Sequence, residues 1–198
     1  MKKTTAPITK GETAMPDMPI LAVYHDRNYD PGWPRHVRQA VRCIILRGGK
    51  VALVKSTAKG FYQFPGGGID PGESHAQALI RETLEEAGLD IIPESIRPFG
   101  ITQEIRASQI AAETIFDHTS YFYLADVAED AHEQVLEDYE KDLGYVLEWA
   151  DPHAAAAVNF ALSPKYEHKS KFLLREAEIL ELLVKKPSSR GEGGTAQP

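Results

Sequence analysis

A glycine-rich loop that runs directly into a helical segment is the feature that most restricts how this chain can fold. Residues 65–73 read Pro-Gly-Gly-Gly-Ile-Asp-Pro-Gly-Glu, and residues 74–87 carry apolar side chains at helical spacing. Gly88 follows, where glycine commonly ends a helix. Glycines let a backbone approach a ligand closely and point its amides or carbonyls at it. The pattern predicts a helix over 74–87 with a ligand-holding loop beside it.

One arc of this predicted helix is apolar and the neighbouring arc is acidic. The expected core stripe consists of Ala76, Leu79, Ile80, Thr83, Leu84 and Ala87. Glu82, Glu85 and Glu86 share the next arc because they are related by i+3 and i+4 spacing. Each like-charge pair costs about 0.2–0.5 kcal/mol, and anions near a helix C-terminus oppose its dipole. A solvated face would explain an acidic arc alone, whereas a site for Mg²⁺ explains why the arc lies beside a glycine loop.

These residues resemble the signature of the Nudix hydrolase family. That signature, Gly-x5-Glu-x7-Arg-Glu-(apolar)-x-Glu-Glu-x-Gly-(apolar), runs here from Gly67 to Leu89 with every fixed residue present. Thr83 stands where an apolar residue is usual, and threonine is small enough to pack there. The resemblance, weaker outside the signature, extends over about residues 36–185. It implies an α+β fold, a Nudix-type α/β/α sandwich with a mixed β-sheet between helices.

The resemblance also implies an activity and a set of site residues. It implies a pyrophosphohydrolase that uses Mg²⁺, with Mn²⁺ as a substitute, and cleaves a diphosphate linkage in a small phosphorylated nucleotide-like substrate. That substrate would be a nucleoside diphosphate derivative or a nucleoside triphosphate. The implied metal ligands are Glu82, Glu85, Glu86 and the carbonyl of Gly66, and Glu82 is alternatively the base for the attacking water. Glu73 and Arg81 are implied to orient the cluster, and Gly66, Gly67 and Gly68 to contact the substrate.

Candidates outside the signature are weaker. Glu104 is the candidate general base, with Glu113 and Glu133 as rivals, although each is more typical of a solvated surface carboxylate than of a base. The acidic stretch 133–142 is expected to be solvated. We assign no metal-binding role to the seven histidines, because none has metal-ligand spacing.

A short aromatic strand over 61–64 offers a possible surface for a nucleobase. Tyr62 is the substrate-binding candidate there, although strand aromatics more often pack in the core. Strand alternation places Tyr62 and Phe64 on one face and Phe61 on the other.

Composition limits the class of partner. The 198 residues carry 29 acidic and 22 basic side chains, a formal net charge of −7, which is a poor match for a nucleic-acid backbone. Cys43 is the only cysteine, so the chain has no internal disulfide, and its apolar neighbours predict a buried thiol in the reducing cytoplasm. No apolar run is long enough to cross a bilayer. We expect a disordered segment over 1–18, a single domain over 19–186 and a flexible tail over 187–198.

The remaining pattern predicts further strands and helices. Strands are expected at 37–46, 51–54, 96–105, 114–127 and 144–149, the first two joined as a hairpin through 47–50. Residues 128–142 are expected to be partly helical or loop. Asp151-Pro152 predicts a capped helix to about Ala161, and 166–185 reads as a longer amphipathic helix. Its apolar residues are expected to dock on the sheet, and they leave a homodimer possible; they are Phe172, Leu173, Ile179, Leu180 and Leu183.

Three alternatives remain beside the hydrolase. A nucleotide-sensing module without turnover commonly loses signature carboxylates, and all are kept here. An RNA end-processing hydrolase and an isomerase on the same fold are the others, the first disfavoured by the acidic balance. The ADP-ribose and dinucleoside-polyphosphate subgroups are marked by a downstream proline or tyrosine, and residues 103–106 contain neither.

Overall fold

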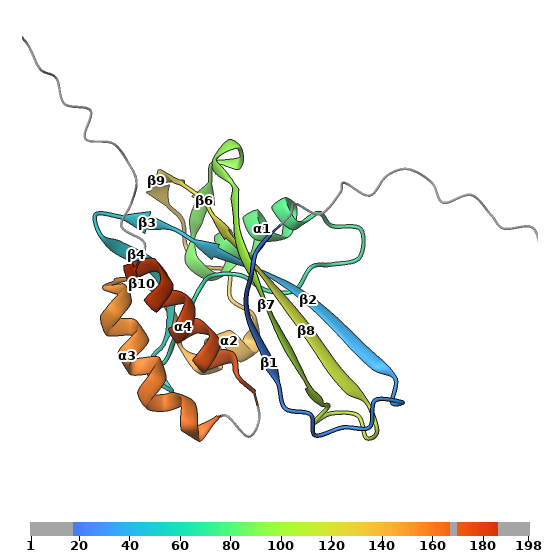
Figure 1. Ribbon diagram of the computed structural model, residues 1–198. Coiled ribbons are helices and arrows are strands. Elements are labelled where there is room, and N and C mark those ends of the chain that lie inside the picture. Colours follow the sequence, from blue (N-terminus) through green and yellow to red (C-terminus); the bar gives the residue numbers. More distant parts are fainter. Residues whose placement is uncertain (1–17, 167–169, 186–198) are drawn as a thin grey trace, which may run out of the picture.

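The computed structural model describes residues 18–166 and 170–185, which form two sheets, a two-stranded ribbon and four α-helices (Figure 1). The strands are β1 (Ile20–His25), β2 (Arg35–Ile44), β3 (Leu46–Arg47), β4 (Lys50–Ser56), β5 (Tyr62–Gln63), β6 (Leu89–Ile91), β7 (Arg97–Ala107), β8 (Ile115–Leu124), β9 (Val127–Ala131) and β10 (Tyr145–Ala150). The helices are α1 (His75–Ala87), α2 (Asp138–Leu143), α3 (Pro152–Leu162) and α4 (Phe172–Lys185), with 3₁₀ turns at Pro93–Ser95 and Ser163–Lys165.

The first sheet is mixed and has the order β1-β7-β8-β2. β1 pairs with β7 and β2 with β8 in parallel, while β7 and β8 pair antiparallel. Its long strands extend away from α3 and α4, which lie side by side (Figure 1). The second sheet has the order β10-β4-β3, with β5 paired to β4, and β6 pairs with β9. The expected α+β class, with a mixed β-sheet and helices, is confirmed.

The predicted hairpin over 37–54 is only partly right. The expected strand at 37–46 is divided: β2 pairs with β8 in the first sheet, whereas Leu46 pairs with Val51 in the second sheet. The hairpin therefore consists of β3 and β4 alone. Ala40–Ile45 are all buried, Arg42 included, so burial is continuous here and gives no signal of the crossing from one sheet to the other.

Helix α1 has the predicted limits. The Ser74 side chain accepts a hydrogen bond from the backbone of Gln77 in a reciprocal capping box, and Gly88 ends the helix at φ 64°. The predicted stripe is partly wrong, because Ala76 is exposed while Ala78 and Glu86 are buried. The buried face of α1 includes Glu86, because the glycine loop and the segment before α2 cover that side of the helix.

Two other segments differ from expectation. Residues 128–142 contain β9 and α2, and Glu140 of this acidic stretch is 4% exposed rather than solvated. The helix expected over 166–185 begins at Phe172. The helix after Asp151 is confirmed, since the Asp151 carboxylate accepts the Ala154 amide at 2.8 Å.

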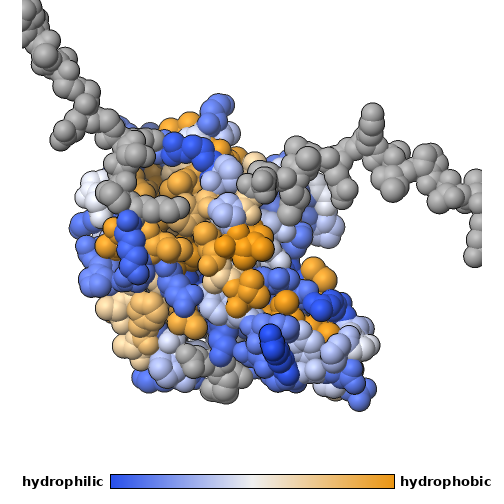
Figure 2. Space-filling model, viewed as in Figure 1, coloured by the Kyte–Doolittle hydropathy of each residue, from blue (hydrophilic) through white to orange (hydrophobic). Residues whose placement is uncertain are grey.

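The core matches the predicted alternation. Tyr62 and Phe64 belong to one buried cluster and Phe61 to another. Leu173, Ile179 and Leu180 are buried, as the docking of α4 required, and Cys43 is buried too; other apolar side chains gather in the middle of the face in Figure 2.

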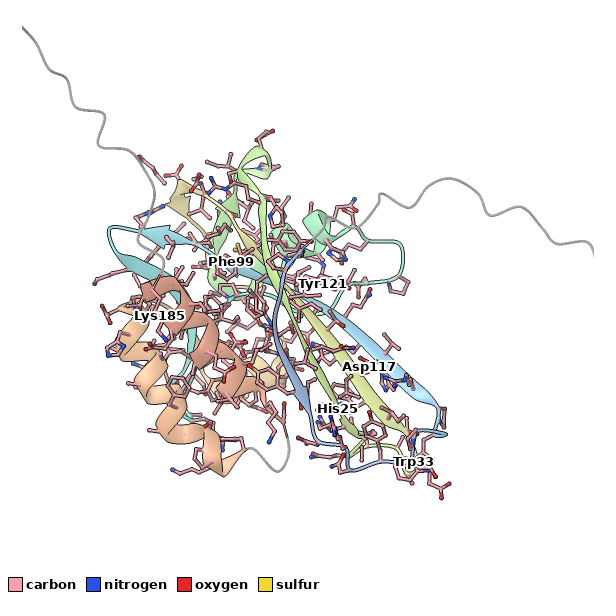
Figure 3. The ribbon with its side chains drawn as sticks, in the orientation of Figure 1. His25, Trp33, Phe99, Asp117, Tyr121 and Lys185 are labelled. Carbon is pink, nitrogen blue, oxygen red and sulfur yellow. The ribbon has the colours of Figure 1, made fainter. Side chains whose placement is uncertain are left out.

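Asp117 and Tyr121 lie along β8 (Figure 3), on the face of the first sheet opposite to its arginine-rich side. Among the described residues no helix is long and apolar enough to cross a membrane. Residues 1–17 and 186–198, where most of the disordered segment and the tail were expected, lie outside the described residues.

Candidate functional site

The glycine loop packs directly on the carboxylates of α1. The Gly66 amide donates to Glu86 Oε2 at 2.8 Å, and the Val41 amide donates to the Gly67 carbonyl at 3.0 Å. A Cβ on Gly67 would collide with the carboxylate of Glu82. Gly66 has φ 138°, and a Cβ there would collide with the Val41 carbonyl. Glycine is required at Gly66, where the collision is with backbone, whereas at Gly67 the colliding atoms are the end of a side chain that Arg81 holds.

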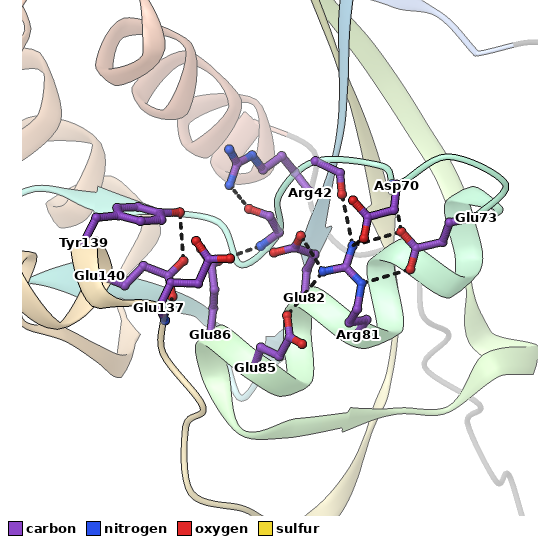
Figure 4. Close-up of polar contacts among 12 residues, drawn as sticks. Arg42, Asp70, Glu73, Arg81, Glu82, Glu85, Glu86, Glu137, Tyr139 and Glu140 are labelled. Atoms are coloured by element: carbon purple, nitrogen blue, oxygen red, sulfur yellow. Dashed lines mark hydrogen bonds and ion pairs between the residues drawn. The ribbon is translucent and has the colours of Figure 1, made fainter.

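Arg81 holds three of the predicted carboxylates together (Figure 4). Its Nε and Nη2 donate to both oxygens of Glu73 at 2.9 Å, and Nη1 donates to Glu82 at 2.8 Å and to Glu85 at 3.2 Å. Nη2 also donates to the Gly68 carbonyl at 3.1 Å. Hydrogen bonding to Arg81 lowers the pKa of Glu73. Glu73, which precedes the helix, is thus joined to the cluster through Arg81 rather than by direct contact.

Replacing Arg81 by glutamine is expected to weaken divalent-metal binding by about 10- to 100-fold, because a guanidinium that orients ligands contributes at this level. Arg81→Lys keeps the charge but not the two-pronged hydrogen bond to Glu73, so it should recover only part of the loss. Calorimetric titration with Mn²⁺ measures the effect, and Arg97→Gln, at the exposed start of β7, is the control. If Arg81→Gln bound Mn²⁺ with wild-type affinity, Arg81 would have no role in positioning the carboxylates.

Glu86 lies at the buried end of the site. It is 3% exposed, and Gln63 Nε2 lies 3.3 Å from its Oε1. Burial raises the pKa of Glu86 well above the ordinary value, Glu140 and Glu82 raise it further, and Arg42 opposes them. Burial also raises the pKa of Glu82. Burial thus disfavours the charged form of both carboxylates, in spite of the neighbouring arginines.

Glu140 is a buried carboxylate of the site that sequence reasoning missed. Its oxygens accept the Glu137 amide at 2.8 Å and the Tyr139 hydroxyl at 2.9 Å (Figure 4). Glu137 and Glu140 have the spacing of a capping box, which can predict the start of α2. No local pattern shows that this helix places Glu140 beside Glu86.

The donor set fits a hard divalent cation by its chemistry. Carboxylates and a backbone carbonyl are the oxygen ligands that Mg²⁺ prefers. Within the described residues, however, no three His, Cys, Asp or Glu side chains are arranged as a metal site. Arg81 holds Glu82 and Glu85, and the Arg42 guanidinium donates to the Gly66 carbonyl. Arg81 uses one oxygen of each carboxylate, Glu82 Oε1 and Glu85 Oε2, so a cation would bind to the other oxygen of each while Arg81 keeps its hydrogen bonds.

Glu104 and Tyr62 form their hydrogen bonds with residues outside this cluster. Glu104 accepts hydrogen bonds from Arg106 at 2.8 Å and from the Lys171 amide at 3.2 Å. The Tyr62 hydroxyl donates to Glu148 at 2.9 Å, and its ring is buried in the core. We therefore carry neither forward as a base or as a nucleobase platform. The rivals Glu113 and Glu133 are exposed.

His118 is a buried histidine to which the sequence assigned no role. It is 6% exposed, and its Nε2 lies 3.1 Å from Ser120 Oγ. Burial lowers its pKa to about 2, and the charges of four arginines add to the shift. These are Arg38, Arg42, Arg106 and Arg175.

His118→Asn is expected to make stability less sensitive to acid. The folded pKa lies below the unfolded value of 6.5, so the unfolded state binds more protons below pH 6.5 and stability falls as pH falls. Between pH 6.5 and 5 the wild type should lose about 2 kcal/mol more than His118→Asn. Urea unfolding at both pH values measures this difference, in which the other titrating groups cancel. If wild type and His118→Asn lost the same free energy of unfolding between these pH values, His118 would accept a proton in the folded state.

The glycine loop, the helix carboxylates and the mixed sheet define the class of protein: one that presents clustered carboxylates from a loop–helix motif. A family model described as "NUDIX domain" matches residues 36–175, well over half of the chain. The chain belongs to the NUDIX domain family. A solved structure, "NUDIX hydrolase from Nitrosomonas europaea", has the same fold, with a TM-score of 0.53 and 20% identity over 74% of this chain and 90% of that one.

Similarity to curated relatives is confined to a short segment. The chain is 41% identical over 56 residues to "CTP pyrophosphohydrolase" of Escherichia coli K12, covering 26% of this chain and 42% of the relative. It is 49% identical over 46 residues to "RNA pyrophosphohydrolase" of Escherichia coli O139:H28, covering 23% of this chain and 26% of the relative. The matches thus span less than half of either relative.

Proposed function

We propose that this protein is a divalent-metal-dependent pyrophosphohydrolase that cleaves a diphosphate linkage in a nucleoside diphosphate derivative or a nucleoside triphosphate. The observation that carries the proposal is the packing of the glycine loop on α1, where Gly66 donates to Glu86 and Gly67 leaves room for the Glu82 carboxylate. The packing supports the proposal because it brings the loop against two of the helix carboxylates, Glu86 and Glu82.

Glu82, Glu85 and Glu86, with the Gly66 carbonyl, are the proposed ligands of Mg²⁺ or Mn²⁺, and Glu140 is a neighbouring carboxylate. The bound cation would neutralise diphosphate oxygens and lower the pKa of a water. The Gly66 carbonyl has two lone pairs, so it can keep its hydrogen bond from Arg42 while serving as a ligand.

The other residues have supporting roles in this proposal. Arg81 fixes the orientation of Glu82 and Glu85 and is itself fixed by Glu73. Glu82 is either a metal ligand or the group that takes the proton of the attacking water. Arg42, 8% exposed beside the loop, places a fixed positive charge next to the site.

Nucleoside triphosphates and 5′-triphosphate RNA are the first substrates to test, because the two curated relatives are named for CTP and RNA. The acidic balance favours the small substrate. A nucleotide sensor without turnover remains the alternative, although every signature carboxylate is present.

The test is a phosphate-release panel with Mg²⁺ or Mn²⁺. It covers triphosphates, 5′-triphosphate RNA, dinucleoside polyphosphates, ADP-ribose and nucleotide sugars, with wild type and Glu85→Gln side by side. We expect metal-dependent release from at least one small substrate and none by the variant. Tight nucleotide binding with no turnover across the panel would overturn the proposal in favour of the sensor.

A further inference from the structure

A cavity of about 670 Å³ lies between the first sheet, the β7–β8 loop and α4. Its wall residue Arg42 donates to the Gly66 carbonyl of the glycine loop. Its walls include Arg38 and Arg42 of β2, Arg106 of β7, His118 of β8 and Arg175 of α4. The strand register explains this grouping. Arg38 is paired with His118 across β2 and β8, and His118 with Glu104 across β8 and β7. Alternate residues of one strand share a face, so Arg38 and Arg42 face the cavity together.

The cavity holds more positive than negative charge, in a chain of net charge −7. Arg106 is paired with Glu104 at 2.8 Å, and Arg175 with Glu176 at 2.7 Å. Arg38 and Arg42 have no ion pair with a carboxylate among the described residues. The surplus comes from these two.

Arg42 is a buried cation whose hydrogen-bonding capacity is only partly used. It is 8% exposed, and its Nη1 donates to the carbonyls of Phe64 and Gly66. Its Nε has no hydrogen-bond partner within the described residues. A buried donor left in this condition is costly, and an anion entering the cavity would repay that cost.

Arg38 is exposed and forms no hydrogen bond or ion pair with the part of the chain that the structure describes. Desolvation at the cavity wall and the neighbouring charge of Arg42 lower its pKa. The four arginines also act together on His118, which stays neutral between them. The charges of the four arginines therefore act on the same part of the cavity, around His118.

We propose that this arginine cavity binds a further phosphate group, carried by the part of the substrate that extends beyond the cleaved diphosphate. The inference rests on the proposed function, because it takes the carboxylates of α1 as the reaction site. Arg42 joins the two places, since it lines the cavity and donates to the Gly66 carbonyl. The substrate class is thus multiply phosphorylated small molecules, not diphosphates whose far part is uncharged.

Guanidinium groups suit this ligand because their planar donors match phosphate oxygens in pairs. A neutral sugar or base would leave the surplus charge of Arg38 and Arg42 uncompensated. The competing possibility is that the arginines only support the fold through Glu104 and Glu176, and the experiment separates the two.

The experiment measures binding of inorganic tripolyphosphate to the metal-free protein in EDTA by calorimetry. Arg38→Gln is the test variant. Arg35→Gln is the matched control, because it removes the same charge from the same strand on the face paired with Asp117. We expect wild type and Arg35→Gln to bind alike and Arg38→Gln to bind about tenfold more weakly, as for loss of a charge-assisted pair.

A second measurement does not depend on the variants. Tripolyphosphate titrated into the wild type should shift the ring resonances of His118, since they lie among the four arginines, and leave those of His153 on α3 unchanged. No binding by the metal-free wild type, or equal weakening in Arg35→Gln and Arg38→Gln, would overturn the proposal.

The two proposals fail in different ways. Mg²⁺-dependent turnover without tripolyphosphate binding would overturn the arginine cavity alone. Tripolyphosphate binding that depends on Arg38, without turnover of any compound in the panel, would overturn the hydrolase and leave an anion-binding protein. With both upheld, Arg38→Gln should raise KM for a triphosphate about tenfold with little change in kcat, as for loss of uniform binding.

Discussion

Replacing Glu85 by glutamine is expected to abolish metal-dependent turnover while leaving the fold intact. The side chain of Glu85 is 41% exposed, and it accepts a hydrogen bond from Arg81 Nη1 at 3.2 Å. Glutamine has nearly the same shape, but it lacks the charge that a hard cation requires. We expect a fall in kcat/KM of about 100-fold or more, since the chemistry would lose a direct metal ligand.

Three measurements test this expectation together. Phosphate release gives the activity, thermal unfolding gives the stability, and unfolding with added Mn²⁺ shows whether the ion binds the folded state. Glu94→Gln, an exposed carboxylate outside the site, is the matched control and should behave as wild type. Full turnover by Glu85→Gln would exclude Glu85 as a metal ligand.

The second large effect concerns stability, and it distinguishes Gly66 from Gly68, two residues along the same loop. Gly66→Ala is expected to destabilise the protein by about 2–4 kcal/mol, because φ 138° is unfavourable for alanine and its Cβ would collide with the Val41 carbonyl. Gly68→Ala should change stability by no more than about 0.5 kcal/mol, because no atom lies within 4 Å of a Cβ at that position.

Urea unfolding of both variants at neutral pH provides the comparison. The loop joins β2 to the helix carboxylates, so a Gly66→Ala protein that still folds should also lose activity. Equal stability of the two variants would show that the loop can shift away from β2, and that the close approach at Gly66 is not required.

Local signals predicted the elements that local interactions fix. The capping residues Ser74 and Gly88 set the ends of α1, and Asp151 with Pro152 sets the start of α3, because each acts within one helical turn. The alternation of Phe61, Tyr62 and Phe64 likewise predicted which side chains share a cluster.

Long-range packing decided what these signals could not. β1 has no fully buried residue and owes its place to pairing with β7, about 80 residues later in the chain. The helical spacing of α1 predicted Ala76 to be in the core. In the structure the glycine loop and the segment before α2 cover the other side of the helix, so Glu86 is buried and Ala76 is exposed.

The carboxylate cluster of α1 and its glycine loop were determined by the sequence, because residues 66–88 are close along the chain and their spacing fixes their relation. The rest of the site depended on the tertiary structure. Glu140 reaches Glu86 from another helix, and the arginines of the cavity come from β2, β7 and α4. Sheet register and helix docking bring these charges together, and neither can be predicted from the spacing of residues close along the chain.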